Sequence, residues 1–138
     1  MIDGLEVGMS RTARYEIDTD RTIGFMGEDL RVYATPWMVR DMENTCRLFI
    51  DEFTGDDLNS VGARVEIDHM GPTLIGMWVD ITVTVTEVKG PKVAFEFEVH
   101  DALDQVGRGN HLRFVVPLDK QKERLVAKRA KADEVAGS

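Results

Sequence analysis

The sequence has little of what disulfide-linked, metal-binding and membrane-spanning proteins require. Cys46 is the one cysteine among 138 residues, which excludes an internal disulfide and most cysteine-based metal sites. No apolar run approaches the roughly 20 residues that cross a membrane. The first residues, MIDGLE, carry neither the basic nor the apolar region of a secretory signal. We therefore expect a cytoplasmic protein with no membrane partner.

Positive charge is also scarce. The 17 Lys and Arg residues face 25 Asp and Glu residues, and the formal net charge is -8. Nonspecific nucleic-acid binding needs a basic surface, so we exclude that class of protein. With 43% hydrophobic residues, the chain is long enough for one domain with a real core and too short for two ordinary ones. We expect one domain over residues 1–138, with a charged, helical C-terminal tail over 119–138.

An amphipathic helix is predicted from Pro36 to about Phe53. Thr35 is a favourable N-cap residue, and proline suits the first helical position because no N–H is needed there. Apolar residues then recur at intervals of three and four, which is typical of a helix packed on a hydrophobic surface. These residues are Met38, Met42, Cys46, Phe49, Ile50 and Phe53. Glu43 lies about 100° around the helix from Met42, so we expect it at the edge of the apolar stripe.

Four segments of alternating apolar and polar residues follow, at the spacing of hairpins. In the last segment Leu112 and Phe114 belong to one, apolar face, whereas His111 and Arg113 belong to the other. A helix followed by antiparallel strands predicts an α+β fold in which the sheet wraps around the helix. Four residues of these strands are then expected to be buried. They are Val65, Ile67, Val83 and Phe97.

This order of elements is similar to the hotdog fold, an antiparallel sheet wrapped around one central helix, and residues within 32–116 resemble the fluoroacetyl-CoA thioesterase family. The residues that carry the resemblance are Ala34-Thr35 with Glu43 eight residues on, Gly62 and His69 in the next strand, and Gly107-x-Gly109-x-His111-x-Arg113. The resemblance implies a homodimer that hydrolyses acyl-CoA thioesters at its subunit interface. It also implies that Thr35, Glu43 and His69 are catalytic, and that Gly62 and Arg113 contact the substrate.

These residue types suit the chemistry. Thioester hydrolysis needs a nucleophile or an activated water, a donor for the carbonyl oxygen, and an acid for the leaving thiolate. The helix start beside Thr35 offers N–H donors, Glu43 is a candidate base or nucleophile, and His69 is a candidate proton relay. Eight helical residues separate Thr35 from Glu43 by about 12 Å along the axis. Either the substrate or His69 lies between them, or each meets groups of the partner subunit.

Each candidate also has an ordinary structural interpretation. Thr35 is suited to be only a helix cap, and Glu43 a solvated helix residue. His69 and His111 are suited to structural hydrogen bonds, and Arg113 to a solvated ion pair.

Other chemistries have weaker support. Cys46 lies on the apolar stripe, and we expect it in the core because nothing near it in sequence favours a thiolate. Asp68 and His69 have no second pair at metal-binding spacing, so we expect no metal and no cofactor. Two alternative functions remain, a non-catalytic acyl-CoA binding or sensing module and, less favoured, an enoyl-CoA hydratase. An Asp-His pair serves such hydratases, but adjacent strand residues face opposite ways. No residue specifies the acyl group.

Overall fold

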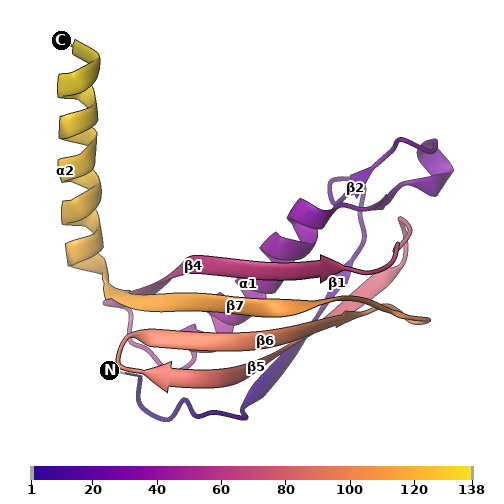
Figure 1. The fold of residues 1–138 in the computed structure, drawn as a ribbon, viewed down its shortest axis with the longest axis horizontal. Coiled ribbons are helices and arrows are strands. Elements are labelled where there is room, and N and C mark those ends of the chain that lie inside the picture. The colour runs from indigo at the N-terminus through magenta and orange to yellow at the C-terminus, as the bar shows by residue number, and fades with distance from the viewer. Residues whose placement is uncertain (1, 138) are drawn as a thin grey trace.

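Helix α1 lies in the concave face of an antiparallel sheet (Figure 1). In the computed structural model, which describes residues 2–137, α1 spans Thr35–Asp51. It begins one residue before the predicted start and ends two residues before the predicted end. Its buried apolar residues have the predicted spacing, which turns one face of the helix toward the sheet. They are Met38, Met42, Cys46, Phe49 and Ile50.

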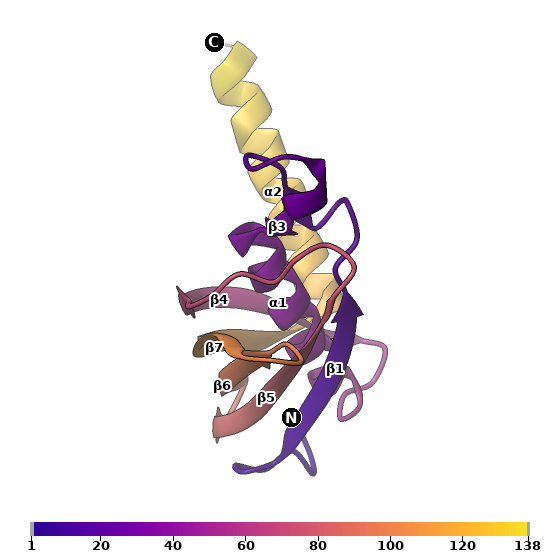
Figure 2. The same ribbon diagram turned by 90° about the vertical axis from the view of Figure 1, so that its right-hand side faces the viewer.

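The sheet has five strands in the order β1-β5-β6-β7-β4, and every neighbouring pair is antiparallel. The strands are β1 (Ser10–Glu16), β4 (Leu58–His69), β5 (Trp78–Lys89), β6 (Lys92–His100) and β7 (Gln105–Pro117). Figure 2 shows the sheet curving around α1, with β4 and β1 at its two edges. The predicted α+β architecture is confirmed.

A small second sheet lies beside the start of α1. Its strands are β2 (Thr22–Ile23) and β3 (Val32–Tyr33), and the 3-10 helix η1 (Glu28–Leu30) lies between them in the chain. An isolated bridge joins Val32 to Leu74, in the loop that follows β4. The segment before α1 and the loop after β4 are therefore held together at the same end of the helix.

The core lies between α1 and the inner faces of β5 and β6. Every second residue is buried over 79–85 in β5 and over 93–99 in β6. Alternation of this kind places one face of each strand against the helix. The prediction that Val83 and Phe97 are buried is confirmed.

The predicted burial of Val65 and Ile67 is wrong, because both side chains are only half-buried. They belong to β4, which pairs with β7 on one side and with no strand of residues 2–137 on the other. An edge strand has neighbours on one side only, so its side chains keep more contact with solvent. A bulge between Gly62 and Arg64 also shifts the alternation along this strand.

The predicted faces of β7 are reversed. His111 and Arg113 point toward α1 and are buried, whereas Leu112 and Phe114 lie on the other face and are half-buried. Buried polar groups need hydrogen-bond partners. These partners come from β4 and α1, which lie far from β7 in the sequence.

Gly107 of β7 lies where α1 passes close to the sheet. A Cβ at this position would lie 2.6 Å from Sδ of Met38. Glycine therefore allows the helix to approach the strand, as expected where two backbones pack closely.

The C-terminal helix α2 (Leu118–Gly137) projects away from the sheet (Figures 1 and 2). None of its described residues is buried. The predicted helical tail is confirmed as far as Gly137. Positions 1 and 138 of the expected domain lie outside the described residues. Over the described part of the chain, no helix has the length and apolar character needed to cross a membrane.

Candidate active site

Thr35 and His69 meet at one end of the molecule. Thr35 is the first residue of α1 and His69 is the last residue of β4. Their side chains are joined by a hydrogen bond of 2.6 Å between Oγ1 and Nδ1. We call these two residues the Thr35 pair. The sequence predicted both as catalytic, and β4 brings them together although 34 positions separate them.

The predicted role of Thr35 as a helix cap is wrong. Ala34 is the N-cap residue, with extended backbone angles, and no side chain caps the helix start. Thr35 already belongs to the helix, so its hydroxyl is free to bond His69. At the helix start, Pro36 has no N–H, and the N–H groups of Trp37 and Met38 bond the carbonyl oxygen of Ala34. Within residues 2–137 the N–H of Thr35 has no hydrogen-bond partner, so it is the donor that the helix start offers to an anion.

His69 is held in its neutral form by its surroundings. Burial lowers the pKa of the ring below its ordinary value, and a hydrogen bond with the Gly71 backbone opposes this in part. The ring of Tyr33 packs edge-on against it, with 6.4 Å between ring centroids. A neutral imidazole beside a hydroxyl is the arrangement of a base and its nucleophile.

A buried ionic network supports this end of the helix. Asp41 of α1 accepts two hydrogen bonds from Arg21, at 2.8 and 3.0 Å, and one of 2.6 Å from the hydroxyl of Tyr33. Burial raises the pKa of Tyr33 far above its ordinary value, and the hydrogen bond with Asp41 raises it further. The network joins the segment before α1 to the helix. Sequence analysis did not find it, because its members are dispersed along the chain.

A second group of polar residues lies further along α1. The carboxylate of Glu43 lies 3.5 Å from Nη1 of Arg113, and the Glu43 side chain is 36% exposed. A Cβ on Gly62 would lie 2.6 Å from Oε2 of Glu43. The structure thus brings together three predicted site residues, from α1, β4 and β7. With Ser60 and His111, described below, they form what we call the Glu43 cluster.

Arg113 is buried, contrary to its ordinary structural interpretation as a solvated charge. It is 4% exposed, and burial lowers its pKa although the nearby Glu43 favours the charge. Its guanidinium donates hydrogen bonds of 2.9 Å to both the hydroxyl and the carbonyl oxygen of Ser60. These bonds fix the direction in which the guanidinium points. Ser60 was not among the predicted site residues.

His111 has a positioning role in the same cluster. Its Nδ1 lies 2.8 Å from the carbonyl oxygen of Arg64, and its Nε2 lies 3.1 Å from Nη1 of Arg113. A carbonyl accepts and a guanidinium donates, so Nδ1 carries the proton and Nε2 accepts. Burial lowers the pKa of His111, which favours this neutral form. The ring therefore orients Arg113 toward Glu43.

The Thr35 pair and the Glu43 cluster remain apart in one chain. No hydrogen bond or ion pair joins them among the residues that the structure describes. Each group opens into its own hollow. The hollow at the Thr35 pair, about 300 Å³, is lined by Ile23, Val32, Tyr33, Thr35, His69, Met70, Gly71 and Pro72. The hollow at the Glu43 cluster, about 440 Å³, is lined by Pro36, Val39, Arg40, Glu43, Asn44, Arg47 and Arg113.

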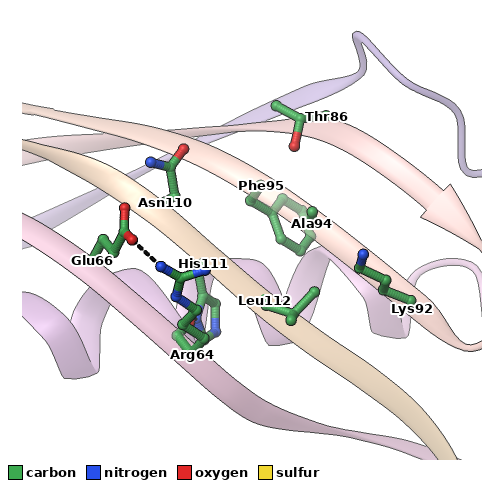
Figure 3. Close-up of a pocket in the computed structure, with 9 residues that line it drawn as sticks. All are labelled: Arg64, Glu66, Thr86, Lys92, Ala94, Phe95, Asn110, His111 and Leu112. Atoms are coloured by element: carbon green, nitrogen blue, oxygen red, sulfur yellow. Dashed lines mark hydrogen bonds and ion pairs between the residues drawn. The ribbon is translucent and has the colours of Figure 1, made fainter.

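A third hollow, of about 270 Å³, lies on the face of the sheet away from α1 (Figure 3). Arg64 and Glu66 form an ion pair on its β4 side, and Asn110 and Lys92 line it from β7 and β6. None of the predicted catalytic residues lines it. We therefore place the candidate chemistry on the helix side of the sheet.

Cys46 lies in the core, as predicted. Its side chain is fully buried, and this burial raises the pKa of the thiol well above its ordinary value. A thiol in this environment stays protonated and is a poor nucleophile. Within residues 2–137, no three His, Cys, Asp or Glu side chains gather in a way that could hold a metal ion.

The sheet that wraps one helix defines a hotdog fold. Residues 17–119 match the model of the fluoroacetyl-CoA-specific thioesterase (FlK) family. The chain belongs to this family and is a thioesterase that acts on CoA thioesters.

Individual relatives agree with this assignment. The chain is 28% identical over 127 residues to the fluoroacetyl-CoA thioesterase of Streptantibioticus cattleyicolor, covering 87% of this chain and 91% of that one. A solved structure of FlK has a TM-score of 0.83 at 26% identity, covering 91% of this chain and 98% of that chain. The structure of a thioesterase superfamily member from Thermus thermophilus has a TM-score of 0.81 at 27% identity, and the match covers 97% of this chain and 98% of that chain.

Proposed function

We propose that the protein hydrolyses acyl-CoA thioesters at a site shared by two copies of the chain. The observation that carries this proposal is the separation of the Thr35 pair from the Glu43 cluster along α1. About 12 Å of helix lies between the two ends, whereas reacting groups must lie about 3 Å from the substrate carbonyl. A second copy, related by a twofold axis, brings the Thr35 pair of one subunit to the Glu43 cluster of the other.

The edge of β4 supports a homodimer. This strand has 12 residues and pairs with β7 on one side only. Long unpaired edges favour pairing with another chain. Val65 and Ile67, which are half-buried in one copy, gain neighbours when a second copy pairs with this edge. Glu43 and Gly62 lie next to the same edge, so the partner reaches the site.

Acylation uses the Thr35 pair. The hydroxyl oxygen of Thr35 attacks the thioester carbonyl while neutral His69 takes the hydroxyl proton. The unpaired N–H of Thr35, at the start of α1, stabilises the charge on the carbonyl oxygen. The C–S bond then breaks, and His69 returns the proton to the leaving thiolate.

Deacylation uses the Glu43 cluster of the partner. Glu43 takes a proton from water, and the resulting hydroxide attacks the acyl group on Thr35. The proton then passes to the oxygen of Thr35, which restores the free enzyme. Arg113 orients the Glu43 carboxylate and, with Gly62, borders the acyl group.

Thiol release from a panel of acyl-CoAs of different chain length tests this proposal. We expect free CoA to appear in an enzyme-dependent manner with at least one acyl group, together with one equivalent of acid. Binding of acyl-CoA without thiol release would instead favour the non-catalytic binding module.

A further inference from the structure

Arg40 is an uncompensated cation at the rim of the hollow that holds Glu43. It belongs to the exposed face of α1, and its guanidinium carbon lies 4.7 Å from the ring centroid of Trp37. This stacking holds the side chain without neutralising it. Within residues 2–137, no carboxylate lies within ion-pair distance of Arg40.

The other two arginines of this hollow have carboxylate partners. Arg113 faces Glu43 at 3.5 Å, and Arg47 faces Asp51 at 3.4 Å. Their charges are therefore balanced within the chain, and Arg40 supplies the excess positive charge of the hollow.

The basic residues that precede α2 show how unusual Arg40 is. All of them in the described part of the chain have a carboxylate within 4.0 Å, except Arg40 and Lys89. Lys89 lies at the hairpin between β5 and β6, away from the hollow. It provides a matched control for the removal of an unpaired charge.

We propose that Arg40 binds a carboxylate at the far end of the acyl group, so that the preferred substrates are short dicarboxylic acyl-CoA thioesters. This inference rests on the proposed function. Residues three apart on a helix have Cβ atoms about 5–6 Å apart, so Arg40 and Glu43 are neighbours. A carboxylate a few methylene groups beyond the thioester carbonyl spans a similar distance. The phosphates of CoA lie at the other end of the long pantetheine arm and match this spacing poorly.

The charge of Glu43 is compatible with such a substrate. Its carboxylate would repel a second carboxylate, but Arg113 lies beside it and balances its charge. The hollow of about 440 Å³ accommodates an acyl chain of a few carbons. Arg40 then forms a charge-assisted hydrogen bond with the terminal carboxylate, which a neutral acyl group of the same length cannot make.

Glutaryl-CoA and pentanoyl-CoA test the inference, because they have the same five-carbon chain and differ in the terminal carboxylate. We expect the wild-type protein to have the higher kcat/KM with glutaryl-CoA. Arg40→Gln should raise the KM for glutaryl-CoA about tenfold and leave that for pentanoyl-CoA unchanged. Arg40→Lys should retain part of the preference for glutaryl-CoA. Lys89→Gln should change the KM of neither substrate.

Three outcomes would overturn the inference while leaving thioester hydrolysis in place. The first is a wild-type protein that hydrolyses pentanoyl-CoA as well as or better than glutaryl-CoA. The second is an equal rise in the KM of both substrates in Arg40→Gln, which would place Arg40 against the CoA part of the substrate. The third is loss of the dimer in Arg40→Gln by size-exclusion chromatography, which would make Arg40 a subunit contact. Absence of hydrolysis with every acyl-CoA would instead overturn the proposed function.

Discussion

The carboxylate of Glu43 occupies the space beside Gly62 into which any side chain at that position would extend. Oε2 lies 2.6 Å from the place of a Cβ, closer than real Cβ contacts come. Gly62 therefore leaves room for the Glu43 carboxylate in its present position. Its backbone conformation does not require glycine, since its φ is not positive.

Gly62→Ala is expected to displace the Glu43 carboxylate and lower turnover by about 10²-fold, the scale of a 1 Å misplacement. The fold should persist, because Glu43 is partly exposed and has room to move. Thiol-release kinetics and a melting curve measure the two effects. Gly137→Ala, where an added Cβ meets nothing within 4 Å, is the control. Full activity of Gly62→Ala would show that the position of Glu43 is not critical.

Glu43→Gln is expected to lower kcat by about two to four orders of magnitude, because the amide keeps the shape and loses the base. If Glu43 acts in deacylation, the acyl group should remain on Thr35. Intact-protein mass spectrometry after mixing with substrate detects this acyl-enzyme. Unchanged turnover in a folded Glu43→Gln variant would remove Glu43 from the mechanism.

Substitutions at Thr35 separate its chemistry from helix stability. Thr35→Ser should retain activity, whereas Thr35→Ala and Thr35→Asn should both be slow because neither has a hydroxyl. Since no side chain caps α1, the alanine variant should not lose the roughly 1 kcal/mol that removal of a cap costs. Urea unfolding measures this difference. An asparagine variant with the parent rate would contradict a nucleophilic Thr35.

The pH dependence of kcat/KM is expected to reflect His69. Its pKa lies below the ordinary value of 6.5 because burial disfavours the charged ring. The neutral, basic form therefore persists as the pH falls to 6.5, and activity should decline only below it. NMR titration of the ring, alongside the rate profile, checks the assignment. An acidic limb centred above 6.5 would exclude His69 as the base.

The buried face of α1 and the core positions of β5 and β6 follow from local sequence pattern. Spacings of three and four predicted the buried face of α1, and alternation predicted Val83 and Phe97 in the core. These features depend on the sequence period alone. The family resemblance predicted Thr35 and His69 as residues of one site, whereas their hydrogen bond was not predicted, because a contact across 34 positions leaves no local signal.

The errors arose where distant partners decide the outcome. His111 and Arg113 looked like an outward face, but Ser60 and Glu43 satisfy Arg113 and allow its burial. Thr35 looked like a cap, but His69 offers its hydroxyl a different partner. Polarity alone does not reveal such compensation.

Mixing two inactive variants tests the shared site most directly. Thr35→Ala and Glu43→Gln dimers, each nearly inactive, would be denatured together, refolded, and assayed by thiol release. In a mixed dimer, one site carries both substitutions and the other carries neither. About half of randomly formed dimers are mixed, so we predict recovery of about a quarter of the wild-type activity. A mixture no more active than the separate variants, with mixed dimers demonstrated, would contradict a site shared between subunits.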